Sequence, residues 1–167
     1  DHYGLLNDIW SYDLDRRTLS RVTFSSIVTS SLWSADGDRL FYGTTQGIQS
    51  INSTGLGQVE ELTNIAASKR YAPLPTTISP DGQQILFTNF DGPVEGSSIH
   101  LLNTAPEHLS EPLINSEFAE LGAAISPDGR WLAYTSNETG REEVYVRPFP
   151  EIDAGKWLIS VQGGGEP

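Results

Sequence analysis

The sequence contains no cysteine and no methionine among its 167 residues, and only three histidines. Without cysteine the chain can form neither disulfides nor thiolate zinc sites. The lack of cysteine is compatible with the cytoplasm as well as with an oxidising compartment. No apolar run approaches the roughly 18 residues of a membrane-spanning helix, so we predict no membrane insertion. The chain opens on Asp1, and we therefore expect it to have been processed, trimmed or taken from a longer protein.

Basic residues are scarce as well. Ten Lys and Arg stand against 22 Asp and Glu, which gives a formal net charge of −12. Nucleic-acid binding is disfavoured, because its affinity comes mainly from Lys and Arg that neutralise phosphates. An anionic membrane surface is disfavoured for the same reason. A basic partner, or simply good solubility, fits this balance better.

Turn-forming residues are abundant, and a turn-centred unit occurs three times. The chain has 16 Gly and 10 Pro. The segments LWSADGDRLFYGT from Leu32, ISPDGQQILFTNF from Ile78 and ISPDGRWLAYTSN from Ile125 align, with a repeat of about 45 residues. Pro at the second turn position presets φ, Asp bonds to backbone amides, and Gly supplies a positive φ. The turn aspartates therefore need no catalytic or metal-binding role.

Each turn is followed by an alternating apolar strand and then by two further strand-like segments. These lie at 47–52 and 59–63, at 97–103 and 110–114, and at 142–149 and 156–161. With the short run ahead of the turn, each unit has four strands, which is the strand count and length of a β-propeller blade.

We therefore predict an all-β fold, a partial β-propeller of about three four-stranded blades plus half a blade. The expected divisions of this single propeller portion are a half blade at 1–30 and blades at 31–75, 76–122 and 123–167.

The phrase SPDGRWLAYTSNETGREEVYVRPFP resembles the repeat of TolB-like, WD40-like propellers of bacteria. Similar propellers accompany bacterial Ser/Thr kinases and prolyl-oligopeptidase and dipeptidyl-peptidase enzymes. The resemblance extends from about Asn7 to Pro167, and it implies a non-catalytic module that binds a protein or peptide partner in the periplasm or elsewhere outside the cytoplasm. Such propellers commonly have six or more blades. We therefore expect either part of a longer chain or copies that close a ring, for example as a homodimer.

Two alternative functions stay open, the substrate-gating propeller of a serine peptidase and the sensor propeller of a bacterial Ser/Thr kinase. The sequence has no Gly-x-Ser-x-Gly nucleophile elbow. Its histidines, His2, His100 and His108, do not occupy equivalent repeat positions, as a metal site on the ring axis would require. No phosphate-binding glycine motif occurs either. We predict no enzymatic activity, no metal and no cofactor.

Candidate binding residues lie in the loops that join one blade to the next, at 27–31, 64–77, 115–123 and 163–167. The second loop carries Lys69, Arg70 and Tyr71 in an otherwise acidic chain, while Glu120 and Glu166 occupy comparable points of later loops. An acidic channel mouth with one cationic, aromatic patch is suited to a peptide terminus or a partner loop.

Overall fold

The computed structural model describes residues 7–24, 27–63, 71–90, 96–165 and 167. Within these ranges the chain forms strands β1–β14 and one short 3-10 helix, η1 (Ile152–Ala154). Strands pair antiparallel with their neighbours, and the order of strands in every sheet follows the order along the chain. No helix in the described ranges is long and apolar enough to cross a bilayer.

One two-stranded sheet, here called the half blade, precedes three four-stranded sheets, called the first, second and third blades. The half blade consists of β1 (Trp10–Asp13) and β2 (Thr18–Arg21). The first blade comprises β3 (Ser31–Trp33), β4 (Arg39–Thr44), β5 (Gly47–Asn52) and β6 (Glu60–Glu61). The second comprises β7 (Leu74–Ile78), β8 (Gln84–Asn89), β9 (Ser98–Asn103) and β10 (Ser110–Ile114). The third comprises β11 (Glu120–Ile125), β12 (Trp131–Ser136), β13 (Glu143–Pro148) and β14 (Trp157–Leu158).

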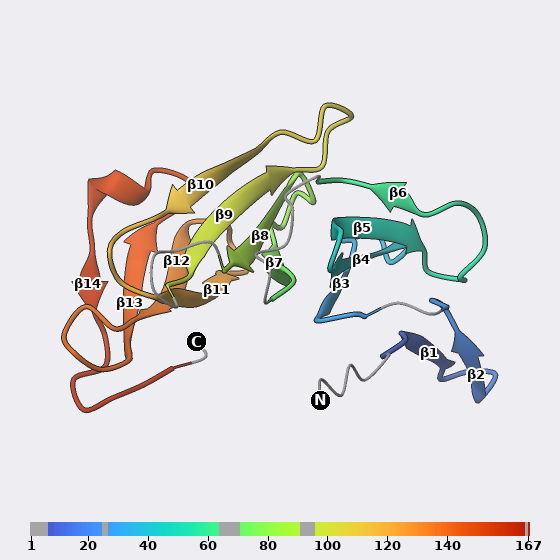
Figure 1. The fold of residues 1–167 in the computed structure, drawn as a ribbon, viewed down its shortest axis with the longest axis horizontal. Coiled ribbons are helices and arrows are strands. Elements are labelled where there is room, and N and C mark those ends of the chain that lie inside the picture. Colours follow the sequence, from blue (N-terminus) through green and yellow to red (C-terminus); the bar gives the residue numbers. More distant parts are fainter. Residues whose placement is uncertain (1–6, 25–26, 64–70, 91–95, 166) are drawn as a thin grey trace.

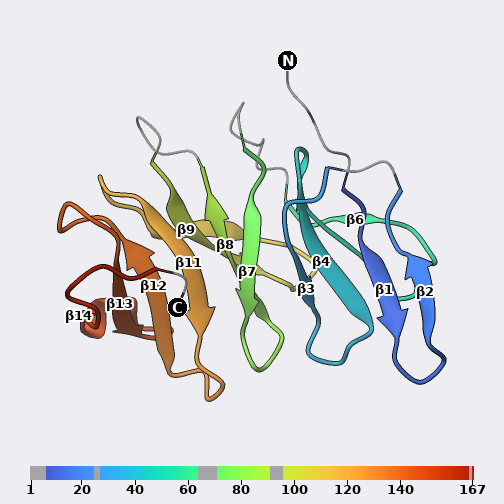
Figure 2. The ribbon, with the colours of Figure 1, turned by 90° about the horizontal axis from the view of Figure 1, so that it is seen from below.

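The blades stand side by side in an open arc (Figures 1 and 2). The first strands of the three full blades, β3, β7 and β11, lie on the inner side of the arc, and β7 contacts both β3 and β11. The outermost strands, β6, β10 and β14, form the convex rim in Figure 1. The predicted partial propeller of about three blades plus half a blade is thereby confirmed.

The hydrophobic core lies between neighbouring blades. One buried cluster joins the half blade to the first blade, and it includes Val22, Leu40, Tyr42 and Ile51. A second joins the first and second blades, with Phe41, Ile48, Ile85, Phe87 and Leu102 among its members. A third joins the second and third blades through residues that include Leu86, Ile99, Leu132, Tyr134 and Tyr145. The first and second blades therefore have buried apolar side chains on both of their faces, as stacked sheets require.

The Ser-x-Asp-Gly turn that follows each inner strand is tightly bonded. In the third blade the Asp128 carboxylate accepts hydrogen bonds from the Ser126 hydroxyl (2.6 Å) and the Arg130 amide (3.1 Å). The Ser126 hydroxyl and then the Arg130 side chain lower the pKa of Asp128 to about 2. Gly129 has a φ of +70°, and a Cβ there would meet Pro80 of the preceding turn at 3.6 Å. Adjacent turns can therefore pack closely, because they carry no bulky side chains at this contact.

The positive φ of Gly129 generates a first prediction. Replacing Gly129 by Val should lower the free energy of unfolding by well over ~1 kcal/mol, since a β-branched residue is strained at positive φ. Gly129→Asn is the matched control, because Asn tolerates this conformation better. Denaturant unfolding of both variants measures the difference. A Val variant as stable as the wild type would contradict the assigned turn.

Candidate functional site

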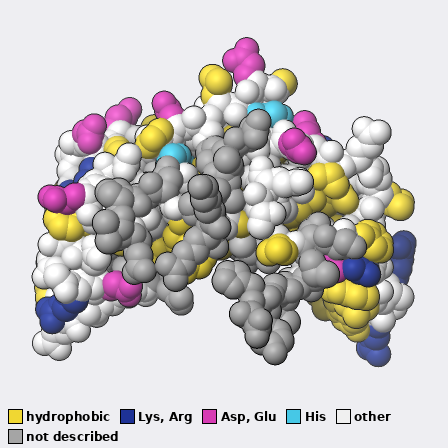
Figure 3. All heavy atoms as spheres, viewed as in Figure 1, with side chains coloured by type: hydrophobic (Ala, Val, Ile, Leu, Met, Phe, Trp, Pro, Cys, Tyr) yellow, Lys and Arg dark blue, Asp and Glu magenta, His cyan; other side chains and the backbone are white. Residues whose placement is uncertain are grey.

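The two ends of the blades differ in character (Figure 2). The Ser-x-Asp-Gly turns lie along the lower edge in that view. The opposite edge, here called the mouth end, carries the segments that lead from one blade into the next, and it faces the viewer in Figures 1 and 3. Figure 3 shows Asp and Glu side chains spread along the convex rim of this face, while most visible Lys and Arg side chains lie near the two ends of the arc. The side chains visible on this face are therefore more often acidic than basic, in keeping with the net charge of −12.

Two of the five predicted binding residues belong to the described part of the chain. Lys69, Arg70 and Glu166 lie outside the described residues. Tyr71 is 50% exposed, and its ring packs against that of Phe90 with a centroid distance of 5.2 Å. The Tyr71 ring is therefore anchored on one side, and half of the side chain is exposed to solvent.

Glu120 occupies a different position from the expected one. The sequence placed it in a loop, but it is the first residue of β11 and is only 2% exposed. Its amide donates to the Ser97 carbonyl at 3.0 Å, and one carboxylate oxygen accepts from the Ser116 hydroxyl. The other oxygen, Oε2, has no hydrogen-bond partner among the described residues. Burial raises the pKa of the Glu120 carboxyl.

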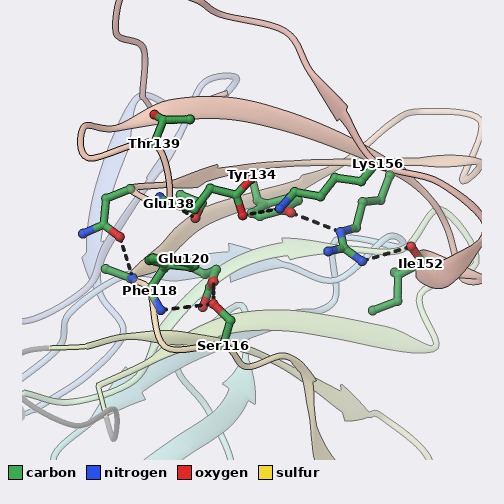
Figure 4. A network of polar contacts seen from close by, with 12 residues as sticks. Ser116, Phe118, Glu120, Tyr134, Glu138, Thr139, Ile152 and Lys156 are labelled. Carbon is green, nitrogen blue, oxygen red and sulfur yellow. Dashed lines mark hydrogen bonds and ion pairs between the residues drawn. The ribbon is translucent and has the colours of Figure 1, made fainter.

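A polar network extends from Glu120 across the third blade (Figure 4). Next to Glu120, the Ala119 amide donates to the Asn137 side-chain oxygen at 2.9 Å. Glu138 forms an ion pair with Lys156, whose Nζ lies 4.5 Å from the centre of the Tyr145 ring. Because all these groups tie strands of one blade together, we assign the network a structural role.

Glu143 is a second buried glutamate, which the sequence analysis did not single out. It is 1% exposed and begins β13. Its carboxylate accepts hydrogen bonds from the Ser160 hydroxyl, the Arg141 side chain (2.7 Å) and the Gly163 amide (3.0 Å). These donors, Ser160 first, lower the pKa of Glu143. The carboxylate thereby fastens the segment after β14 to the start of β13.

The half blade contains an equivalent set of hydrogen bonds around an acidic side chain. There the Asp8 carboxylate accepts from the Thr23 hydroxyl at 3.2 Å, and the Ile9 amide donates to that hydroxyl oxygen at 2.8 Å. In the third blade the Val144 amide donates to the Ser160 hydroxyl oxygen, also at 2.8 Å. In both places the sequence has an acidic residue directly before an apolar one, and a Ser or Thr near the end of the repeat. This pattern is the signal that could have predicted the hydrogen-bonded carboxylate.

The mouth end contains a pocket of about 300 Å³ between the second and third blades, here called the mouth pocket. Residues of β7, β8, β11 and β12 line it together with two residues from mouth-end segments. The lining residues are Leu74, Thr76, Thr88, Leu121, Gly122, Thr135, Glu142 and Gly165. The pocket therefore combines apolar side chains, hydroxyl groups and one carboxylate beside the inner strands.

A second pocket, of about 440 Å³, lies at the turn end between the same two blades. Asp81 and Asp128 are its acidic lining residues. Each accepts a hydrogen bond from the turn Ser and another from a backbone amide, so both carboxylates already have partners. This pocket consequently offers less unused binding capacity.

The described histidines occupy structural positions. His100 is buried in β9, where its Nε2 lies 3.0 Å from the Ser98 hydroxyl and its ring packs beside Phe87. His108 Nε2 lies 3.3 Å from Glu60 Oε1 and links the second blade to the first. His2 lies outside the described residues. In the ranges that the structure describes, no three His, Asp or Glu side chains are grouped to hold a metal.

The two buried glutamates generate a second prediction: replacing each by Gln should change the stability of the fold in opposite directions. The raised pKa of Glu120 means that its ionisation costs stability from about pH 4.3 upward, so Glu120→Gln should stabilise the fold at neutral pH and lose this advantage at lower pH. The lowered pKa of Glu143 stabilises the fold above the usual glutamate pKa, and this contribution is lost as pH falls through the folded-state pKa. Glu143→Gln should therefore destabilise the neutral protein, because the charged acceptor of these hydrogen bonds is lost.

Unfolding curves of both variants between acidic and neutral pH measure these effects, and each variant is the control for the other. Equal shifts of the same sign in the two variants would contradict the assigned environments.

Neither a protein-family model nor a curated protein matches the sequence. Solved structures do match. TolB from Acinetobacter baumannii aligns over 95% of this chain and 38% of its own, with a TM-score of 0.71 and 20% identity. A chain of the nidogen/laminin complex aligns over 95% of this chain and 60% of its own, with a TM-score of 0.72 and 11% identity.

Two peptidases are similar as well. The tricorn protease has a TM-score of 0.66 at 13% identity, over 90% of this chain and 19% of its own. A prolyl endopeptidase has a TM-score of 0.62 at 12% identity, over 93% of this chain and 26% of its own. This chain thus spans less than two thirds of each of these proteins. The four antiparallel sheets, their stacking and these likenesses together give the chain the fold of a TolB-like, WD40-like β-propeller.

Proposed function

We propose that the chain is a non-catalytic β-propeller module that binds a protein or peptide partner at its mouth end. The observation that carries the proposal is the mouth pocket beside the inner strands β7 and β11. It offers Leu74 and Leu121 as apolar contacts and hydroxyl groups for hydrogen bonding, the combination found in ligand sites. Tyr71, half exposed at the same end, adds an aromatic side chain of the kind enriched at interfaces.

Charge supports a basic rather than an acidic partner. The chain has a formal net charge of −12, and the mouth pocket is lined by one carboxylate and no Lys or Arg. Electrostatic complementarity of this kind raises association rates and excludes like-charged competitors. The similar nidogen/laminin structure is a complex between proteins, which makes a protein partner a reasonable ligand for this fold.

The proposal includes no catalytic step and no cofactor. His100 and His108 are both engaged with neighbouring side chains, Ser98 and Glu60 respectively, and each fits a structural role. The shared fold with TolB makes a bacterial, extracytoplasmic setting part of the same proposal.

Exposed aromatic side chains on the two end faces of the arc support the idea that further blades complete a ring. Trp10 and Tyr12 are exposed on the half blade, and Trp131 and Trp157 are exposed on the third blade, where their rings pack edge to face. Apolar faces at the ends of a stack are normally covered by another repeat. We propose that further blades of a longer chain cover these two end faces. A second copy of the chain is the alternative.

A second candidate function is the substrate-gating propeller of a serine peptidase. The likeness to the tricorn protease and to a prolyl endopeptidase favours it. A longer form of the chain that contains a Gly-x-Ser-x-Gly elbow would support this candidate over the first.

Selection from a phage-displayed library of random peptides tests the proposed binding. We expect the chain to enrich peptides that Tyr71→Ala binds about tenfold more weakly, because an exposed aromatic side chain is removed from the mouth end. Trp157→Ala, a change on the distant end face, is the control and should bind normally. Peptides recovered intact by mass spectrometry would support a non-catalytic module.

Two results would contradict the proposal. One is the absence of any enriched peptide. The other is a set of peptides whose binding depends on Trp157 and not on Tyr71.

A further inference from the structure

We propose that the mouth pocket receives one basic side chain, a lysine or an arginine, of the bound partner. This inference rests on the proposed function, and it names the chemistry that the pocket selects. It follows from hydrogen-bonding capacity that the fold leaves unused, from the shape of the lining and from the absence of a competing cation among the lining residues.

The unused capacity belongs to Glu142 and Thr88. Glu142 is exposed in the segment before β13, and its carboxylate makes no ion pair or side-chain hydrogen bond with any residue in the described ranges. Thr88 is 1% exposed, and its hydroxyl oxygen is buried with no hydrogen-bond partner among those same residues. Buried polar groups are normally satisfied, so an unpartnered hydroxyl in a pocket lining indicates a missing ligand group or water.

Nearby cations are already committed elsewhere. Arg141, the neighbour of Glu142 in the sequence, donates to Glu143 at 2.7 Å and also to the Val161 carbonyl. Lys156 of the third blade is paired with Glu138. Neither side chain is therefore free to neutralise Glu142, and the carboxylate can attract a cation from a partner.

The shape of the pocket suits a long side chain that ends in a charge. Leu74 and Leu121 provide apolar contacts for an aliphatic stem, while Glu142 and Thr88 provide oxygens for the head. A Cβ added at Gly165 would lie 3.5 Å from Glu142 Oε2 and 3.8 Å from the Thr135 hydroxyl, so these two oxygens flank the same small space. Lys and Arg side chains have this division into apolar stem and charged head.

The volume agrees with one side chain rather than a larger ligand. At about 300 Å³ the pocket lies at the lower limit of typical small-molecule sites. The larger turn-end pocket is less suited, because its two aspartates are already bonded within their turns. The mouth pocket is accordingly the better site for a cation.

A double-mutant cycle tests the inference directly. One synthetic peptide from the library selection is compared with a copy in which its basic residue is replaced by norleucine, which keeps an aliphatic stem and lacks the charge. Both are titrated against the wild-type chain and against Glu142→Gln. Glu111→Gln, an exposed change of equal charge on β10, is the control.

We expect Glu142→Gln to weaken binding of the basic peptide at least about tenfold, because a charge-assisted hydrogen bond is lost. Glu111→Gln should leave the affinity unchanged. The norleucine peptide should bind the wild type about as weakly as the basic peptide binds Glu142→Gln, and it should not distinguish the two proteins. Such coupling marks a direct contact between the basic residue and Glu142.

Two outcomes would overturn the inference while leaving the proposed function standing. In one, the enriched peptides contain no recurrent Lys or Arg. In the other, Glu142→Gln and Glu111→Gln bind the basic peptide equally well. A chain that enriches no peptide at all would instead overturn the proposed function. Thermal unfolding of the Glu142 variant, expected to match the wild type because the side chain is exposed, separates lost binding from lost folding.

Discussion

Packing of one sheet face against the next is the interaction on which this structure depends. A four-stranded sheet of this size has no interior of its own, so its apolar side chains become buried only when another blade covers them. Leu86 and Ile99 of the second blade meet Leu132 and Tyr134 of the third in this way. The mouth pocket lies at the same junction, so its shape is set by the distance between two blades and not by one loop.

The sequence was sufficient to predict the repeat, because its turns require particular residues. Only Gly fits well at the φ of Gly129, and the Asp128 carboxylate bonds within its own turn, so both features are local. The outermost strands were predicted too long, at 59–63 and 156–161, whereas β6 and β14 have two residues each. In the third blade the Val144 amide donates to the Ser160 hydroxyl and not to a backbone carbonyl. The pattern of apolar residues in a strand does not reveal that a side chain replaces the backbone as acceptor.

The candidate site was harder to predict, because burial depends on residues distant in the sequence. Glu120 was expected in a loop, but it pairs with Ser136 of β12 as the first residue of β11, and its amide donates to the Ser97 carbonyl of the preceding blade. Glu143 stands next to Glu142 in the sequence, yet only Glu143, the first residue of β13, is buried, while Glu142 lies exposed in the segment before the strand. Thr88 and Leu121 are brought together only by blade stacking, so the mouth pocket has no signature in the sequence.

The agreement between strand order and chain order has a consequence for how the molecule forms. Each strand pairs with the one synthesised just before it, and each blade then packs on its predecessor. Loop closure between such near neighbours costs little chain entropy. A nascent chain can therefore complete one blade before the next leaves the ribosome, with the finished blade as the template for the following one. Assembly of this kind proceeds from the N-terminus toward the C-terminus, and each new blade covers the apolar face of the blade before it.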